Sequence, residues 1–315
     1  MKFYFAPLEG LTGYIYRNAH HTFFPDGVDQ YFSPFVIPNQ SGSFKTRDMN
    51  DLLPENNQGI HLVPQLLTNN AEDFIQTAKR IKQLGYSQIN LNLGCPSGTV
   101  VSKGRGAGFL VKRAELDHFL DSIFSRQVTK ISIKTRLGKE SPEEFDALIE
   151  IFNKYPMEEL IIHPRVQTDF YKNKPNMQAF AAAAIKSKTP VCYNGDLFSL
   201  EDLRIFLAGY PHVDRVMLGR GLLINPNMIQ AHLFQTRVDK KRLKCFHDRL
   251  LDDYSSNLFG GKNILFKMKD LWSYMALLFS DHEKHVKRIK KTQNVRDYQD
   301  AVARLFVESD IMESR

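Results

Sequence analysis

The stretch Ile-Asn-Leu-Asn-Leu-Gly-Cys-Pro at residues 89–96 leads into Lys-Gly-Arg-Gly-Ala-Gly-Phe-Leu at residues 103–110. Apolar and polar side chains alternate up to Leu93, which predicts a β-strand, and Gly94 and Pro96 end it. Cys95 therefore lies at the tip of a strand, just before a basic, glycine-rich loop. Such a loop is a suitable place for chemistry beside a bound anion. A buried structural thiol is the simpler interpretation of a single cysteine, so the rest of the chain has to decide.

Length and composition limit the class of protein. A chain of 315 residues can bury a large core, and its formal charge of +7 permits a polyanionic partner without requiring one. The start has no long apolar run typical of a signal peptide, and no stretch approaches a membrane span. Three scattered cysteines, Cys95, Cys192 and Cys245, suit no disulfide framework and form no CxxC pair for zinc. We therefore expect a cytoplasmic protein without a bound metal.

Eight segments have the pattern of strands, and most of them are followed by a helical pattern. This alternation predicts an α/β protein with a (β/α)8 TIM barrel, the alternative being a doubly wound open sheet. The open sheet is disfavoured because its phosphate motif would follow the first strand, where no such fingerprint stands. The capping pattern predicts helices that start near residues 71, 141 (capped by Ser141, with Pro142 first) and 200, and a further helix at 113–125. The strands are predicted at 2–6, 30–36, 61–66, 88–93, 130–135, 159–163, 190–193 and 213–218.

From about Asp239 onward the strand pattern ends and helical periodicity takes over. We expect a catalytic barrel over residues 1–238 and an all-helical domain over residues 239–315. From Lys241 to the end, fifteen Lys and Arg stand against eleven Asp and Glu, a balance of +4. A solvated helix face is the simplest interpretation of such a charge run. Tyr254, Trp272 and the cysteines at 192 and 245 are predicted to be packing residues.

Side chains that can bind ligands recur at the carboxyl ends of the predicted strands. In a (β/α)8 barrel these ends surround one cavity. A single polar residue has an ordinary explanation, such as a capped turn, but repetition at several strands favours a shared site. The residues concerned are Pro7, Leu8 and Glu9, Gln65, Asn92 with Cys95, Lys134 with Arg136, His163, Asn194-Gly195-Asp196 and Gly219-Arg220-Gly221.

The last two of these strand ends are typical of a phosphate site. Glycines there expose backbone N–H groups beside Arg220, and the loops after strands seven and eight are where such barrels usually hold phosphate. Lys134 and His163, on adjacent strands, could reach the polar edge of a ring above that phosphate. A lysine in this place stabilises negative charge on a reduced isoalloxazine. The residues therefore predict a flavin mononucleotide (FMN) barrel with a cysteine over the ring.

The same residues resemble a known family, the flavin-dependent tRNA dihydrouridine synthases. The resemblance spans the whole barrel in the family's order, and the Asn-Leu-Gly-Cys-Pro stretch with its downstream Gly-Ala-Gly is its most specific part. The opening Glu9-Gly10 is similar to the bacterial branch that acts at position 16. Two departures are visible: Leu8 stands where methionine is common, and Pro164 replaces the glycine or alanine between His163 and Arg165.

The resemblance implies a reaction and a role for the cysteine. Reducing the uracil C5–C6 double bond needs a hydride at C6, from FMN that NADPH has reduced, and a proton at C5. Cys95 suits the proton donor, because an ordinary thiol with a pKa of ~8.5 stays mostly protonated at neutral pH yet releases its proton readily. The target base must leave its stack to reach the flavin. Pro7, Leu8, Glu9, Gln65, Lys134, His163, Asn194, Gly195, Asp196, Gly219 and Arg220 are expected to bind the cofactor.

With an RNA substrate, the basic segments become candidates for phosphate contacts. We expect tRNA as the partner, no DNA and no membrane, and a monomer. A ribosomal-RNA dihydrouridine synthase, an oxidoreductase of a free pyrimidine and an RNA-binding protein with an inactive barrel remain alternatives. The helical domain and the basic loop argue against a free pyrimidine, and the complete set of site residues argues against lost activity. The expected substrate contacts are Asn92, Lys103, Arg105, Arg136, Lys284, Lys287, Arg288 and Lys291.

Overall fold

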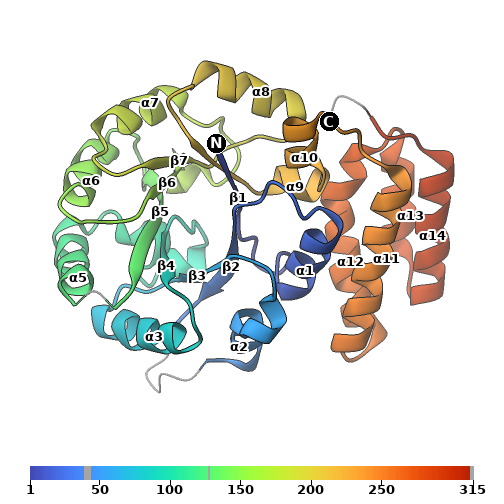
Figure 1. The fold of residues 1–315 in the computed structure, drawn as a ribbon, viewed down its shortest axis with the longest axis horizontal. Coiled ribbons are helices and arrows are strands. Elements are labelled where there is room, and N and C mark those ends of the chain that lie inside the picture. Colours follow the sequence, from blue (N-terminus) through green and yellow to red (C-terminus); the bar gives the residue numbers. More distant parts are fainter. Residues whose placement is uncertain (39–43, 127, 313–315) are drawn as a thin grey trace. The chain divides into compact units, whose positions relative to one another are not determined.

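The computed structural model describes residues 1–38, 44–126 and 128–312, in which neighbouring strands pair in parallel and close into a barrel in the order β1 to β8 (Figure 1). The predicted (β/α)8 barrel is confirmed, and the open sheet is excluded because a closed barrel has no edge strands. The strands are β1 (Lys2–Phe5), β2 (Gln30–Val36), β3 (Leu62–Leu66), β4 (Gln88–Leu93), β5 (Lys130–Gly138), β6 (Leu160–Val166), β7 (Val191–Tyr193) and β8 (Arg215–Leu218).

Helices follow most strands and then form the C-terminal part of the chain. The α-helices are α1 (Tyr14–Phe23), α2 (Thr46–Leu52), α3 (Ala71–Gln83), α4 (Gly98–Val101), α5 (Arg113–Ser125), α6 (Glu144–Phe152), α7 (Met177–Lys186), α8 (Leu200–Gly209), α9 (Arg220–Ile224), α10 (Met228–Phe234), α11 (Lys240–Asn257), α12 (Gly261–Met275), α13 (His282–Lys291) and α14 (Val295–Glu308). Short 3-10 helices are η1 (Pro54–Asn57), η2 (Gly106–Phe109), η3 (Gln167–Asp169) and η4 (Ala276–Leu278).

The two prolines inside strands coincide with breaks in the ladder. Pairing of β2 with β3 shifts register between Phe32 and Phe35, around Pro34. Pairing of β5 with β6 shifts between Arg136 and Gly138, beside Pro164. Proline has no N–H to donate, so the ladder yields at these points instead of ending. This is why β5 and β6 end at Gly138 and Val166 and not at the predicted 135 and 163.

Local capping chemistry sets the starts of the helices around the barrel. The Asn70 side chain accepts a hydrogen bond from the Asp73 N–H (2.9 Å) and begins α3, as predicted. The start of α6 differs from the prediction. Ser141 is not its cap, because the Glu144 carboxylate accepts the N–H groups of residues 139, 140 and 141, and the helix begins at Glu144 itself.

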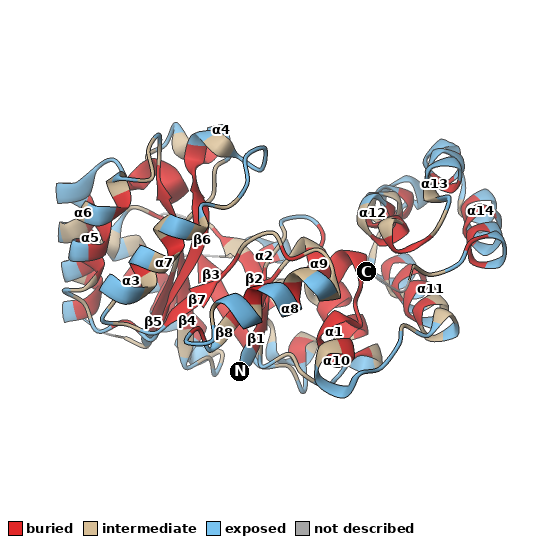
Figure 2. Cartoon of the chain, turned by 90° about the horizontal axis from the view of Figure 1, so that it is seen from above, coloured by how far each residue is buried: buried red, intermediate tan, exposed pale blue. Residues whose placement is uncertain are grey.

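The barrel interior is apolar in its lower layer. The inward side chains form one buried cluster that includes residues from six strands, and the strands are buried almost throughout (Figure 2). Inside a barrel such layers form a packed core and leave no pore. The cluster contains Tyr4, Ala6, Phe32, Val63, Ile161, Cys192 and Met217.

The contacts divide the chain into two compact units. The barrel unit comprises Met1–Pro7, Asp29–Asp196 and Pro211–Met217, and the helical unit comprises Leu8–Val28, Leu197–Tyr210 and Leu218–Arg315. The helical unit thus includes α1, α8, α9 and α10 besides the C-terminal helices. The predicted boundary at residues 238 and 239 falls where α11 begins, and it stays a prediction.

The C-terminal helices share a core with one buried polar network. The Tyr298 hydroxyl lies 2.6 Å from His247 Nε2 and accepts the Trp272 indole N–H at 2.8 Å. Trp272 and Tyr254 are buried, as predicted, and so is Cys192. The prediction for Cys245 was wrong: its side chain is exposed, because α11 turns the neighbouring Phe246 inward instead. Among the described residues, no helix is long and apolar enough to cross a membrane.

Candidate active site at the barrel mouth

A polar layer lies directly above the apolar core of the barrel. Successive inward side chains of a strand are two residues apart, so the position after Val63 is Gln65 and the position after Ile161 is His163. The same step leads from Cys192 to Asn194. The change from apolar to polar occurs at the carboxyl ends of the strands, where barrel enzymes carry their active sites. Gln65, Asn92, Lys134, His163 and Asn194 thus belong to one mouth, as the sequence predicted.

Amide side chains connect β3, β4 and β5 within this layer. Gln65 donates to Asn90 Oδ1 (2.7 Å) and accepts from Asn92 Nδ2 (2.8 Å). Asn90 in turn donates to the Ser132 hydroxyl at 2.9 Å. These side chains are buried, where an unpaired amide is costly, so the network fixes their orientation.

The turn that carries Cys95 is held from several sides. Asn92 Oδ1 accepts the N–H groups of Gly94 (3.0 Å) and Cys95 (2.9 Å). Arg136 Nε donates to the Gly94 carbonyl (3.0 Å), and Gln167 Nε2 donates to the carbonyl of Pro96 (3.0 Å). The half-buried thiol is therefore positioned by backbone bonds on both sides of it. Such positioning is what a proton donor needs.

Arg136 has a different role from the predicted substrate contact. Its side chain is 2 % exposed, and its other two nitrogens donate to the carbonyls of Val166 (2.9 Å) and Phe170 (2.8 Å). The guanidinium thus joins the Cys95 turn to the segment that follows β6. We assign Arg136, with Asn92 and Gln167, to positioning. Gln167 was missed in the sequence, where a glutamine beyond a strand end carries no distinguishing pattern.

The glycine-rich loop closes over the same turn. The Ala107 N–H donates to the Cys95 carbonyl at 3.1 Å. Gly106 has φ of +55°, and a Cβ there would lie 2.8 Å from the Cys95 carbonyl oxygen and 3.0 Å from its Cβ. Only glycine combines this left-handed backbone with so close an approach. The loop is thus shaped to fit the cysteine.

Asn69 holds the basic part of this loop. Its amide donates to the carbonyls of Lys103 and Gly104 (both 3.2 Å) and accepts from Arg105 Nε (3.3 Å). The Lys103 side chain is exposed and Arg105 is half-buried. The sequence suggested Asn69 only as part of a helix start. Its role could be found only once the loop folded back onto β3.

Lys134 dominates the electrostatics of the mouth. It pairs in register with Asn92, and no carboxylate in the described part of the chain forms an ion pair with it. Its pKa is lowered to about 8, chiefly by burial and then by the charge of Arg136, while the thiols of Cys192 and Cys95 act in the opposite direction. An ammonium in this state is stabilised by any anionic or carbonyl group placed beside it.

The end of β6 contributes a neutral histidine and an ion pair. Arg165 is buried and donates from both terminal nitrogens to the Asp196 carboxylate, and its Nη1 also lies 3.1 Å from His163 Nε2. Burial, and then the charges of Lys134 and the arginines, lower the pKa of His163 well below its usual range. His163 is thus uncharged at neutral pH. Asp196, predicted to bind the cofactor, is held by Arg165.

The strand-seven loop is tightly built. Asn194 Nδ2 donates to the Met217 carbonyl at 2.8 Å and so ties β7 to β8. A Cβ on Gly195 would lie 2.0 Å from the Tyr193 hydroxyl, so no larger residue fits there. The loop thus brings bare backbone to the mouth, as a phosphate site requires.

The other predicted cofactor residues outside the barrel unit belong to the helical unit. The Leu8 N–H donates to Thr12 Oγ1 (2.7 Å) in the turn after Pro7, and Glu9 is exposed. Gly219 precedes α9, and the guanidinium of Arg220 lies 4.7 Å from the centre of the Phe198 ring.

The predicted RNA contacts of the tail share one face of α13. Lys284, Lys287, Arg288 and Lys291 are three or four residues apart and exposed. Lys284 lies 3.5 Å from the Glu308 carboxylate, whereas the described carboxylates form no ion pair with the other three. The face therefore carries uncompensated positive charge.

The donor set of the mouth fits a flavin. Lys134 offers a positive charge without a competing carboxylate, and the amides and the neutral imidazole around it offer hydrogen bonds to the polar edge of a ring. Across residues 1–38, 44–126 and 128–312, no group of three His, Cys, Asp or Glu could hold a metal ion. Fold and site together define a barrel enzyme with a positioned thiol above a cationic mouth.

Comparison with known proteins gives the family. The model of the dihydrouridine synthase (Dus) family matches residues 4–309, so the chain belongs to this family. A tRNA-dihydrouridine(16) synthase of Pseudomonas putida is 29% identical over 243 residues, covering 72% of each chain. One from Neisseria meningitidis is 28% identical, covering 71% of this chain and 68% of its own. The predicted family and enzyme class are confirmed.

Solved structures with similar folds extend the comparison of the barrel. Morphinone reductase in complex with tetrahydroNAD gives a TM-score of 0.54 at 10% identity and covers 76% of this chain and 88% of its own. Histamine dehydrogenase from a Rhizobium species gives 0.57 at 11% identity, over 78% of this chain and 46% of its own. At such identities the likeness concerns the fold.

Replacing Gly106 by alanine should lower the rate of dihydrouridine formation about tenfold or more, because the new Cβ would displace Cys95. The matched control is Gly98→Ala in the same loop, where the new Cβ meets nothing within 4 Å. Rates of both purified variants on an RNA transcript check this. Equal rates would mean that Gly106 does not position the thiol.

Proposed function

We propose that this protein reduces a uridine of tRNA to dihydrouridine, at position 16. The observation that carries the proposal is the positioned thiol of Cys95 beside the unpaired ammonium of Lys134, in a chain of the dihydrouridine synthase family. The names of the Pseudomonas and Neisseria relatives support tRNA as the substrate and position 16 as the target. A ribosomal RNA or a free pyrimidine as substrate would each give a different result below.

FMN is the cofactor that the mouth suits best, with NADPH as reductant. When bound, the flavin would supply the hydride for C6 of the base. Lys134, Gln65 and His163 would hold the polar edge of its ring, and Asn194, Gly195 and the Gly219–Arg220 segment its phosphate. Pro7, Leu8 and Glu9 would contribute contacts from the loop after β1. Asp196 would act indirectly, through the ion pair with Arg165.

Cys95 would deliver the proton to C5 from the opposite face of the base. The half-buried thiol can meet a base that enters the mouth, and its backbone is fixed by Asn92, Arg136 and Gln167. Fixed geometry keeps the proton close to C5 without a search over conformations. The base itself must be unstacked, which costs a few kcal/mol and is easier in an RNA loop.

Two basic surfaces would bind the RNA backbone. One consists of Lys103 and Arg105 beside the cysteine, and the other of the α13 face that ends at Lys291. Phosphate contacts of this kind release counterions, so they add affinity without reading the sequence. We propose that residues 239–315 act as an RNA-binding domain in a monomeric cytoplasmic enzyme.

Cys95→Ala should lower dihydrouridine formation by about 100-fold or more, because no donor would protonate C5. Flavin content and tRNA affinity should stay unchanged. A strain lacking the gene, supplied with each variant, would be mapped for dihydrouridine along its RNA. Cys245→Ala, which changes an exposed thiol on α11, is the control and should restore the modification. Full modification by Cys95→Ala would refute the donor role, and a lost site in ribosomal RNA alone would refute tRNA.

The affinity of the flavin-free protein for FMN should fall a few-fold as the pH rises through about 8, where Lys134 loses its proton. The pKa is lowered in the fold, so the attractive charge is present below about 8 and absent above it. Fluorescence titrations across this range would measure the effect. Lys134→Met should remove the pH dependence, and Lys130→Met, at the exposed start of the same strand, should keep it. The same pH dependence in both variants would exclude Lys134.

Lys287→Glu combined with Lys291→Glu should weaken tRNA binding and make the slope of log K against log salt shallower by about 2. NADPH oxidation should be unaffected. Binding at several salt concentrations gives the slope. Lys79→Glu with Lys82→Glu, two exposed lysines of α3, make the same charge change as a control. A slope equal to that of the unmodified protein would place the phosphate contacts elsewhere.

A further inference from the structure

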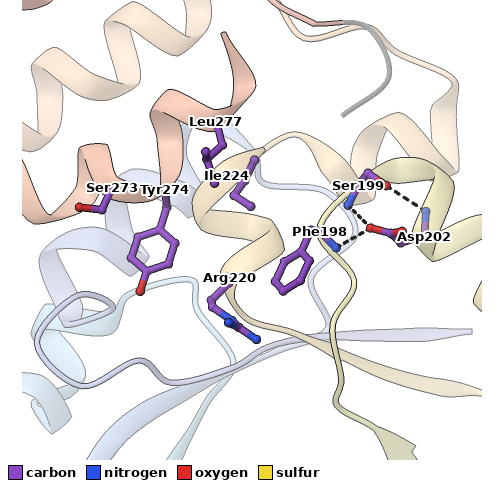
Figure 3. Close-up of a pocket in the computed structure, with 8 residues that line it drawn as sticks. All are labelled: Phe198, Ser199, Asp202, Arg220, Ile224, Ser273, Tyr274 and Leu277. Atoms are coloured by element: carbon purple, nitrogen blue, oxygen red, sulfur yellow. Dashed lines mark hydrogen bonds between the residues drawn. The ribbon is translucent and has the colours of Figure 1, made fainter. Parts of the chain in front are cut away.

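A pocket of about 580 Å³ lies within the helical unit, away from the residues assigned above to the thiol chemistry (Figure 3). Its walls come from three places in the sequence: the start of α8, the helix α9 and the outward side of α12 with η4. Phe198, Arg220, Ile224, Ser273 and Tyr274 line it. A volume of this size accommodates one nucleotide.

The walls of this pocket combine aromatic rings with a positive charge. The Arg220 guanidinium lies 4.7 Å from the centre of the Phe198 ring, and in Figure 3 it projects between that ring and Tyr274. Stacking on a ring orients a guanidinium while leaving its edge available to an anion. Ile224 and Leu277 add apolar surface. A flat apolar ring with an attached phosphate has the complementary chemistry.

The one carboxylate of the pocket is engaged in capping a helix. Asp202 Oδ2 accepts the N–H groups of Phe198 and Ser199, both at 2.9 Å, and Ser199 Oγ accepts the Asp202 N–H at 3.0 Å. Its charge is therefore offset by backbone donors at the start of α8. This also holds Phe198 in place, because the backbone of Phe198 is one of the donors.

The outward face of α12 continues from the pocket along the helix. Residues 262, 266, 273 and 277 lie on the side opposite to the buried Met268 and Trp272. Phe266 is 70 % exposed, and Lys262 is exposed as well. An exposed aromatic ring with an adjacent lysine is typical of surfaces on which RNA bases stack.

We propose that this pocket binds one nucleotide of the substrate RNA other than the uridine that is reduced. The base lies between Phe198 and Tyr274, the phosphate meets Arg220, and the strand continues along α12 past Phe266. The inference rests on the proposed function only in taking RNA as the substrate. The pocket would add affinity and hold the RNA in one register.

Tyr274→Ala should weaken the binding of a tRNA transcript to the flavin-loaded protein about tenfold, because one stacking ring is lost. Tyr274→Phe, which keeps the ring, should bind like the unmodified protein. Phe234→Ala, which removes an aromatic side chain on α10 that is 57 % exposed, is the control and should change nothing. Fluorescence anisotropy gives the dissociation constants, and absorbance gives the flavin content.

A second pair of variants does not depend on Tyr274. Ser273 is exposed on α12, so Ser273→Asp should fold and should repel a phosphate in the pocket, whereas Ser273→Ala should not. Weaker binding by Ser273→Asp alone supports the proposal. Unchanged RNA binding by both Tyr274→Ala and Ser273→Asp would overturn it, as would loss of flavin with normal RNA affinity. Tight RNA binding without uridine reduction by the unmodified protein would refute the proposed function and leave this inference standing.

Discussion

The guanidinium of Arg136 is the interaction on which the active site depends. It lies inside the protein and donates to three backbone carbonyls, at Gly94, Val166 and Phe170. These carbonyls belong to loops that no strand pairing holds together. A charged group with several donors in a fixed geometry can satisfy carbonyls that point in different directions, which a single amide cannot. Without it, the turn that carries Cys95 would be anchored to β4 alone, through Asn92.

The two chemical groups of the mouth need opposite surroundings, and the barrel provides both. Burial lowers the pKa of Lys134, so its charge is poorly compensated until a partner arrives. Cys95 stands at the rim, half-buried, where a base can reach it. The polar layer between them, from Gln65 through Asn92, satisfies its own hydrogen bonds and leaves the lysine to the ligand. Catalysis in such a site rests on fixed charge and position and requires no rearrangement of these side chains.

RNA recognition uses surfaces of another kind. The α13 face and the loop at Lys103 offer charges that contact phosphates without distinguishing one RNA from another. Selection of one uridine requires contacts that depend on the shape of the folded RNA, and aromatic rings such as Phe198, Tyr274 and Phe266 can provide them. Affinity and selectivity would therefore be carried by different residues of the chain.

The sequence by itself determined the barrel, because strand and helix periods alternate eight times and caps such as Asn70 act within a few residues. It also located the mouth, since the polar residues at strand ends recur in chain order. The roles of Arg136, Gln167 and Asn69 were decided only by the tertiary structure. Each bonds to backbone carbonyls of loops far away in the chain, and a carbonyl leaves no mark on the residue type that carries it. The exposure of Cys245 was decided in the same way, by which face of α11 met its neighbours.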